Sequence, residues 1–441
     1  MAANLSAKER IEHGRAQRNV VSRAVQANLK PEDRQFAPID VLRASAESRV
    51  PQLLPVKYAR MRVSPFAFFR GAVSIMAADL GRLPNSGIHV QLCGDAHVQN
   101  MGSFATPDGK LVFDLNDFDE TIRGPWEWDV KRMAASIVLA GRESGHGRSG
   151  CKSAAEMFVE SYCRSINNFS QLPLLGVARH QIHRQRRVEP IHAALRQSEH
   201  ASPMDLLAKF TQKDARGHTH FRDMRPGFWR IKGQKAKEVL GSLELYRKIL
   251  TPERQHLFDL FQSLDVGFKV VGTGSVGLRD YVVLFQGNHE RDPMFLQIKQ
   301  EVSSAYANYL KHSVPQHQGR RVAEGQRAMQ PISDLMLGWT TVGHHHYLVR
   351  QLNDHKGSID LQRLRDDGLR SLALIAGELL ARGHARSGDA CEIRGYCGSG
   401  LKMAAALREF AVQYADQTEA DYGLFITAIQ SGKIKAAAAP A

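Results

Sequence analysis

Residues 92–120, LCGDAHVQNMGSFATPDGKLVFDLNDFDE, contain the pattern that decides the fold. Two short apolar stretches, IHVQL at 88–92 and KLVFDL at 110–115, each run into a polar loop, and the turn signal TPDG lies between them. These stretches predict two short strands. Because a short hairpin places its two ends side by side, we expect the polar loops that flank it to meet in space.

The loops around these strands are rich in oxygen-bearing side chains. Asp95 and Asn100 lie in the first loop, and a second acidic cluster, at the end of the second strand and in the loop after it, contains Asp114, Asp117 and Asp119. Phosphoryl transfer needs such a set. One carboxylate orients or deprotonates the attacking hydroxyl, while an Asn oxygen and another carboxylate hold Mg²⁺ on the nucleotide phosphates. The same residues could instead cap turns and helices, as Asp and Asn often do.

A glycine-rich segment, GTGSVG at 272–277, is the second motif. A dinucleotide-binding fingerprint of this type should open a helix, whereas the following residues, LRDYVVLF, favour a strand. A glycine loop between two strands is how kinases cover the phosphates of ATP. We therefore predict phosphate binding by Gly272, Gly274, Ser275 and Gly277, with a hairpin turn that binds no ligand as the alternative.

Lys299 follows this loop on the apolar stretch MFLQIKQE at 294–301. A lysine on such a strand could reach the α- and β-phosphates, but it would need an acidic partner to fix its position. We favour Glu324, in the next helix-like segment, over the nearer Glu301, because a helical glutamate can point back at the sheet. The alternative is a lysine on an edge strand, exposed to solvent.

The segment WEWDVKRM at 126–133 begins a predicted amphipathic helix. A buried Asp129 there could accept backbone N–H groups and hold the preceding polar loop in shape, although an ordinary aspartate at a helix N-terminus fits equally well. We expect His97 and Asp119 to orient the same site. The three histidines at 344–346 do not predict zinc, because alternate residues of a strand face opposite sides.

The composition is that of an ordinary globular protein. The 441 residues are 43% hydrophobic and 24% charged, which excludes wholesale disorder and coiled coil. No run of about 18 apolar residues occurs, and residues 1–20 lack an apolar stretch, so neither a membrane span nor a secretory signal is expected. Five scattered cysteines without a CxxC pair favour a reducing cytoplasm.

The net charge of +14 attracts polyanions without choosing among them. The most basic stretch, residues 180–196, has almost no aromatic residues, which argues against stacking on single-stranded nucleic acid. We therefore expect a nucleotide rather than a nucleic acid as the anionic partner.

Predicted helices and a short hairpin come first along the chain, a strand-rich segment follows, and helices then return. This order predicts an α+β protein with a β-rich lobe set inside a helical one. The expected divisions are an N-terminal arm (1–40), a helical lobe with the polar loops (41–230), a β-rich nucleotide-binding lobe (231–355), C-terminal helices (356–432) and a frayed tail (433–441).

The stretch from GDAHVQN to GPWEWDVKRMAAS resembles the C-lobe core of the aminoglycoside phosphotransferase and choline kinase group of protein kinase-like proteins. That resemblance implies that Asp95 is the catalytic aspartate and that Asn100 and Asp117 bind magnesium. Over nearly its whole length the chain is also similar to an uncharacterised bacterial family, domain of unknown function 2252, through stretches such as RMRVSPFAFFRG, KVVGTGSVGLR and VAEGQRAMQ. This second resemblance implies no activity.

The order of the motifs differs from that of kinases, in which the glycine loop and lysine precede the catalytic and metal loops. A circular permutation of the two-lobed kinase-like fold would reconcile the two orders, with the β-rich lobe inserted into the helical one. This hypothesis predicts that Gly272–Gly277 and Lys299 fold over Asp95, Asn100 and Asp117.

Together the motifs favour an ATP- and Mg²⁺-dependent phosphotransferase that acts on a hydroxyl- or amine-bearing small molecule or protein. One alternative is transfer of the nucleotidyl group to a protein. Another is a pseudokinase, which binds nucleotide or serves as a scaffold without turnover. A third is a metal-dependent hydrolase built on the Asp cluster and His97. A basic nucleic-acid binder comes last, and salt would strongly weaken its binding.

Overall fold

The computed structural model describes residues 5–107, 109–181, 191–199, 202–270, 272, 274–311, 315–352, 357–365 and 367–438. Its α-helices are α1 (Ala7–Val20), α2 (Pro38–Ala44), α3 (Leu54–Met61), α4 (Pro65–Gly71), α5 (Val73–Leu80), α6 (Trp126–Glu143), α7 (Arg148–Phe169), α8 (Leu174–Arg179), α9 (Ile191–Glu199), α10 (Pro203–Phe210), α11 (Gly233–Gly241), α12 (Leu243–Ile249), α13 (Pro252–Asp259), α14 (Gln318–Met329), α15 (Gly368–Ser387), α16 (Ala390–Cys397) and α17 (Leu401–Gln430). Its strands are β1 (His89–Leu92), β2 (Met101–Ala105), β3 (Leu111–Leu115), β4 (Ile122–Pro125), β5 (Thr211–Lys213), β6 (Thr219–Phe221), β7 (Phe228–Ile231), β8 (Gln262–Lys269), β9 (Asp280–Gln286), β10 (Pro293–Glu301), β11 (Gly338–Val342), β12 (His345–Gln351) and β13 (Gly357–Ser358). The architecture is α+β, as the sequence predicts.

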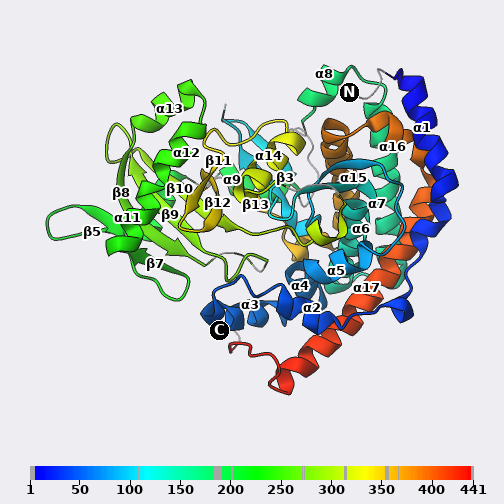
Figure 1. The fold of residues 1–441 in the computed structure, drawn as a ribbon, viewed down its shortest axis with the longest axis horizontal. Helices are drawn as coiled ribbons and strands as arrows, with labels where there is room; N and C mark the ends of the chain where they lie inside the picture. The colour runs from blue at the N-terminus through cyan, green and yellow to red at the C-terminus, as the bar shows by residue number, and fades with distance from the viewer. Residues whose placement is uncertain are drawn as a thin grey trace.

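The largest sheet has six antiparallel strands in the order β11-β12-β10-β9-β8-β7, and Figure 1 shows it at the left of the molecule. The glycine-rich segment joins β8 to β9, and β10 carries Lys299 opposite Asp280 and Leu348. Because β10 is a central strand, the ammonium group of Lys299 lies inside the molecule, and the residue is 3% exposed. The interpretation of Lys299 as a solvent-exposed edge lysine is therefore wrong.

Three short strands interrupt the segment that the sequence assigns to a helical lobe (41–230). Strands β5 and β6 form a hairpin of their own, and β7 joins the large sheet as its sixth strand. The ring of Trp229 on β7 stacks on Phe268 of β8, with ring centroids 4.5 Å apart. Aromatic packing of this kind stabilises neighbouring strands, and it explains why β7 pairs where the sequence predicted no strand.

The helical part is built around α6, most of whose side chains are buried. The ring of Trp126 at its start stacks on Tyr162 of α7, with ring centroids 5.4 Å apart. Helices α15 and α17, which follow the large sheet in the chain, pack against α6 and α7, which precede it. Figure 1 shows these four helices together on the side opposite the sheet. The chain therefore leaves the helical part, forms the sheet and returns.

The predicted hairpin is present as β2 and β3, in register from Met101 opposite Leu115 to Ala105 opposite Leu111. Its turn is closed by a hydrogen bond from the Thr106 N–H to the Lys110 carbonyl at 2.8 Å. The first predicted strand, β1, pairs instead with β4. The hairpin is thus the unit that follows the Asp95 loop and precedes the Asp117 loop.

Both ends of the described chain pack onto the helical part. Helix α1 runs along α16, and Arg10 forms an ion pair with Asp389 at 2.8 Å. The sequence predicts a frayed tail at residues 433–441, but residues 433–438 pack onto the protein. Ile434 is buried, and the Ala437 N–H donates to the Pro55 carbonyl at 2.9 Å. Residues 439–441 lie outside the described ranges.

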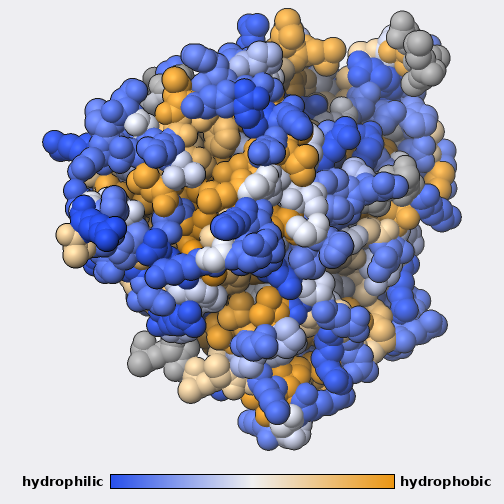
Figure 2. All heavy atoms as spheres, turned by 60° about the vertical axis from the view of Figure 1, so that its left-hand side comes forward, coloured by the Kyte–Doolittle hydropathy of each residue, from blue (hydrophilic) through white to orange (hydrophobic). Residues whose placement is uncertain are grey.

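Figure 2 shows the sheet side of the surface, where apolar residues are interspersed with a larger number of hydrophilic ones. Across the described ranges, the structure contains no helix whose length and apolar character would let it span a bilayer.

Candidate active site

The Asp95 loop begins at the end of β1 with a tight backbone contact. Gly94 has a φ of 87°, and a Cβ atom at this position would lie 2.2 Å from the Glu120 carbonyl oxygen. Only glycine can adopt this conformation so close to another backbone without strain. The contact presses the Asp95 loop against the acidic loop that follows β3.

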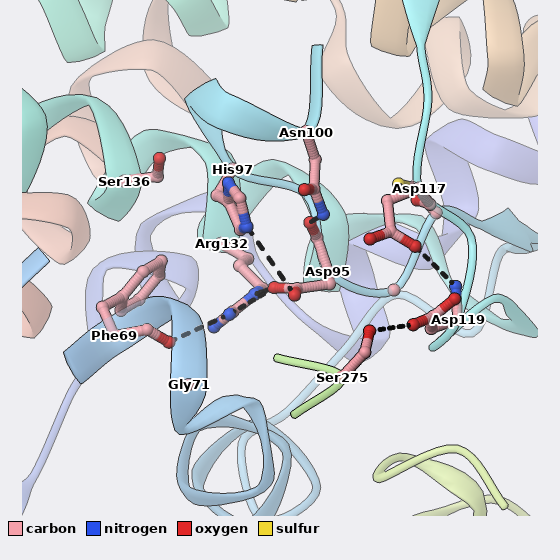
Figure 3. A network of polar contacts seen from close by, with 12 residues as sticks. Phe69, Gly71, Asp95, His97, Asn100, Asp117, Asp119, Arg132, Ser136 and Ser275 are labelled. Carbon is pink, nitrogen blue, oxygen red and sulfur yellow. Dashed lines mark hydrogen bonds and ion pairs between the residues drawn. The ribbon is translucent and has the colours of Figure 1, made fainter. Parts of the chain in front are cut away.

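The carboxylate of Asp95 is paired with a buried arginine on α6 (Figure 3). Arg132 donates from Nε to Asp95 Oδ1 at 2.7 Å and also from Nη2, and its side chain is fully buried. Burial raises the pKa of Asp95, although the Arg132 guanidinium acts in the opposite direction. His97 Nε2 lies 3.7 Å from the other carboxylate oxygen, Oδ2. The pair therefore fixes the direction in which the Asp95 carboxylate points.

Asp129, which also lies on α6, supports the backbone at the start of the same loop. Its carboxylate accepts the backbone N–H groups of Cys93 at 2.6 Å and Gly94 at 2.9 Å. His384 of α15 lies 3.2 Å from Asp129 Oδ2, and its other ring nitrogen lies 2.8 Å from the hydroxyl oxygen of Tyr162. This is the arrangement that the sequence analysis described for a buried aspartate at this position.

The β2–β3 hairpin brings the two polar loops together. The Asn116 N–H, directly after β3, donates to the Asn100 carbonyl at 3.1 Å, and Asn100 Nδ2 donates to the Asp95 carbonyl at 2.8 Å. Asp114 does not belong to this cluster, because it is buried and forms an ion pair with Arg382 of α15. Of the three aspartates predicted for the second cluster, Asp117 and Asp119 remain next to the Asp95 loop.

Two segments of the large sheet meet Asp119 across a long sequence separation. Lys299 Nζ lies 2.5 Å from Asp119 and 3.9 Å from Asp117 Oδ1, while Ser275 Oγ of the glycine loop donates to Asp119 Oδ2 at 2.8 Å. Burial alone would raise the pKa of Asp119, but the Lys299 ammonium, followed by hydrogen bonds with Asp117 and Ser275, lowers it below its usual range. Figure 3 shows Ser275 approaching Asp119, with Asp95 and Asn100 on the adjoining loop.

The glycine loop itself rests on the segment before α3. The Val50 N–H donates to the Gly277 carbonyl at 2.7 Å, and Gly277 has a φ of 95°. Gly272 accepts a hydrogen bond from the Val276 N–H at 3.1 Å, and a Cβ atom on Gly274 would lie 3.8 Å from the Arg70 carbonyl oxygen. The loop therefore lies between the helical part and the start of β9.

The predicted pairing of Lys299 with Glu324 is wrong. Glu324 has a 45% exposed side chain and forms an ion pair with Arg320 at 2.7 Å, one turn away on α14. The helical phase explains the error, because α14 turns its neighbour Arg321 inward instead. Glu301 lies near Lys299 on the same face of β10, but burial raises its pKa well above the usual range, and no ion pair between the two is among the contacts of the described residues.

Arg321 was not identified from the sequence, yet it supports the acidic loop. Its Nη2 donates to the carbonyl oxygens of Asp119 and Val302, both at 2.8 Å, and its Nη1 donates to the Thr121 carbonyl. The residue is 2% exposed. Helix α14 thus contributes a cation that fixes the backbone of the loop, and not an anion that fixes Lys299.

The predicted magnesium ligands, Asn100 and Asp117, lie on adjoining loops but form no complete metal site. Within the described residues there is no cluster of three or more His, Cys, Asp or Glu side chains that could hold a metal ion. Magnesium on a nucleotide typically takes one or two protein oxygens, with phosphate oxygens and waters completing its shell. The residues present therefore fit a magnesium ion that arrives with a phosphate ligand.

Fold and site together define an α+β protein in which a glycine loop and a buried lysine from an antiparallel sheet meet the acidic loops of a helical part. The chain belongs to the bacterial family DUF2252, described as "Uncharacterized protein conserved in bacteria", whose family model matches residues 49–428. No match was found among curated proteins. No solved structure matched either. The family match spans the residues of the candidate site.

Proposed function

We propose that the protein is an ATP- and Mg²⁺-dependent phosphotransferase. The observation that carries the proposal is the convergence of Lys299 and the glycine-loop residue Ser275 on Asp119, two residues after Asp117. In protein kinases a glycine loop covers the phosphates, a lysine stands on the third strand, and an aspartate loop holds Mg²⁺. Here β8, the glycine loop, β9 and the lysine strand β10 follow one another in that order.

The path of the chain supports a circular permutation of that kinase-like arrangement. The sheet is inserted between helices that pack together, since α15 supplies Arg382 to Asp114 and His384 to Asp129. Residues from both sides of the insertion therefore build one acidic loop region. An inserted sheet is what the reversed order of the motifs requires.

The proposed step moves a phosphoryl group from ATP to an acceptor oxygen or nitrogen. The acceptor atom forms a bond to the γ-phosphorus while the bond from that phosphorus to the β–γ bridging oxygen breaks, and ADP leaves. Asp95 orients the acceptor and takes its proton, and Lys299 with the glycine loop holds the phosphates. Magnesium, held by Asn100 and Asp117, would neutralise charge on the phosphate oxygens.

A second candidate, nucleotide binding without turnover, is favoured by a specific feature of the site. Lys299 is already paired with Asp119, and Asp95 is already paired with Arg132. A pseudokinase would leave both pairs in place around a bound nucleotide, whereas a kinase has to release Lys299 toward the phosphates.

Titration calorimetry with ATP and Mg²⁺, followed by an ATP turnover assay, tests the proposal. We expect the wild type to bind, Lys299→Met to bind at least about 10-fold more weakly, and Asp95→Asn to bind normally but turn over roughly 10²–10⁴-fold more slowly. Glu324→Gln is the matched control, because this carboxylate is exposed and lies away from Lys299. A wild-type protein that binds no nucleotide would contradict the proposal.

Binding without turnover in the same assays would favour the pseudokinase. Mass spectrometry of modified acceptor proteins separates the remaining alternative, because kinase activity adds a phosphoryl group and nucleotidyl transfer adds an adenylyl group.

A further inference from the structure

Arg70, at the end of α4, is a half-buried cation beside the candidate site. Its Nε is buried and has no hydrogen-bond partner, and no ion pair joins its side chain to any residue in the described part of the chain. Other arginines near the site donate side-chain hydrogen bonds, as Arg132 does to Asp95 and Arg49 does to the Val276 carbonyl. Burying a guanidinium without a partner costs free energy, so an unpartnered one needs a functional reason.

The end of α4 lies between the Asp95 loop and the glycine loop. The Phe69 carbonyl accepts a hydrogen bond from Arg132 at 3.2 Å, and the Gly71 carbonyl accepts one from Lys57 at 2.9 Å. The backbone of Arg70 is the nearest to Gly274, at 3.8 Å from an ideal Cβ there. Figure 3 shows Phe69 and Gly71 on either side of this position, next to Arg132 and the segment that carries Ser275.

The carboxylates that act most strongly on Arg70 belong to the candidate site. Burial lowers the pKa of Arg70, and the carboxylates that act against this effect are Asp95 and Asp117, followed by Glu143. The first two are the predicted catalytic and metal-binding residues. Both carboxylates act on the Arg70 guanidinium electrostatically, but neither forms an ion pair with it among the described residues, so the guanidinium is free to bind an anion.

We propose that Arg70 binds a phosphate group between the glycine loop and Asp95, supplied either by the terminal phosphate of the nucleotide or by an anionic acceptor. The source of the phosphate rests on the proposed function. A guanidinium suits this role because its fork of N–H donors matches phosphate oxygens, and an arginine supplied in cis can stabilise the charge of a transferring phosphoryl group.

Arg70→Met and Arg70→Lys, made in the full chain, test the inference, with Arg43→Met as the control for loss of one exposed positive charge on α2. Calorimetric titration with ATP·Mg²⁺ and with ADP·Mg²⁺ compares the two nucleotides. We expect Arg70→Met to weaken ATP binding roughly 10-fold or more while changing ADP binding less than about 2-fold, with Arg70→Lys in between. Thermal melting should show Arg70→Met unfolding no earlier than the wild type, because the change removes no hydrogen bond or ion pair between the side chain of Arg70 and the described residues.

Titration of pyrophosphate into the ADP·Mg²⁺-saturated protein shows whether the phosphate group bound by Arg70 comes from the nucleotide or from the acceptor. If Arg70→Met leaves ATP binding intact but weakens pyrophosphate binding, the phosphate belongs to the acceptor. If Arg70→Met changes none of these affinities, the inference is overturned. If the wild type binds no nucleotide, the proposed function fails separately, and titration with pyrophosphate alone then tests the role of Arg70. Weaker pyrophosphate binding by Arg70→Met supports that role. Unchanged or absent pyrophosphate binding refutes it.

Discussion

The two acidic loops of the site are held in different ways. Asp95 is fixed within the helical part, by Arg132 on its own carboxylate and by Asp129 on the backbone before it. Asp119 is fixed across to the sheet, by Lys299 and Ser275. The first loop is therefore held by contacts within the helical part, whereas the second depends on contacts between the helical part and the sheet.

Removing the support of the first loop should give the largest effect. Asp129→Ala leaves the buried N–H groups of Cys93 and Gly94 without their acceptor and deprives His384 of its partner. We expect the free energy of unfolding to fall on the order of 3 kcal/mol, measured by urea denaturation. Asp416→Ala, at an exposed ion pair, should cost within about 1 kcal/mol. Equal losses in the two variants would mean that the first loop is not held as described.

The sheet side carries a buried carboxyl whose neutralisation should stabilise the protein. Burial raises the pKa of Asp280 to about 6, although Lys269, Lys299 and Arg350 act against it. Because the folded state holds this proton more tightly than the unfolded state, whose pKa is about 3.9, stability is lost as the pH rises from about 4 to about 6.

The free energy of unfolding of Asp280→Asn should therefore exceed that of the wild type by about 2–3 kcal/mol at pH 8. At pH 4 the two free energies should be about equal. Gln297 donates to Asp280 at 2.6 Å, and an asparagine oxygen can accept the same bond. Denaturation at the two pH values measures the difference. An Asp280→Asn protein that is less stable than the wild type at pH 8 would show that the carboxylate charge is needed by its lysine neighbours.

The stability contributed by the Asp119–Lys299 ion pair has the opposite pH dependence. The pKa of Asp119 is lowered in the folded state, where Lys299 outweighs burial, so its contribution is present above the unfolded pKa of about 3.9 and is lost as the pH falls below it. Lys299→Met should cost about 1–2 kcal/mol at pH 7, and the difference from the wild type should shrink below about pH 4. Lys152→Met, at an exposed ion pair, is the control. A deficit that stays constant down to pH 3 would argue against the Asp119 pair.

The smallest effect is expected on the outer face of α14. Glu324→Gln removes an exposed pair with Arg320 and should change the free energy of unfolding by within about 0.5 kcal/mol. If Glu324→Gln lowered the free energy of unfolding as much as Lys299→Met does, Glu324 would have to be reconsidered as the partner of Lys299.

The sequence was sufficient for the elements whose pattern is local. The turn signal TPDG placed the β2–β3 hairpin, and the strand preference after the glycine loop separated it from a dinucleotide fingerprint. Strand β7 was missed because its pairing depends on Trp229 meeting Phe268, more than 35 residues away. Only tertiary packing makes that contact favourable.

Sequence motifs singled out the candidate oxygen-bearing residues and Lys299, but none of the arginines that lie beside them. Asp95, Asn100, Asp117 and the lysine on β10 follow from motif spacing. Arg132, Arg321 and Arg70 stand in ordinary helical segments, where residue type does not reveal which face is buried. The choice of Glu324 failed for the same reason, since the rotation of α14 about its axis places Arg321 against the loop and leaves Glu324, three residues later, exposed.

The close approach of Gly94 to the Glu120 carbonyl has a consequence for substitution. With 2.2 Å between that oxygen and the place of a Cβ atom, the two acidic segments are in direct backbone contact, with no room for a side chain between them. The sheet and its glycine loop meet the same acidic segment through side chains instead, Lys299 and Ser275 on Asp119. Position 94 is accordingly the place where an added methyl group would disturb both segments at once.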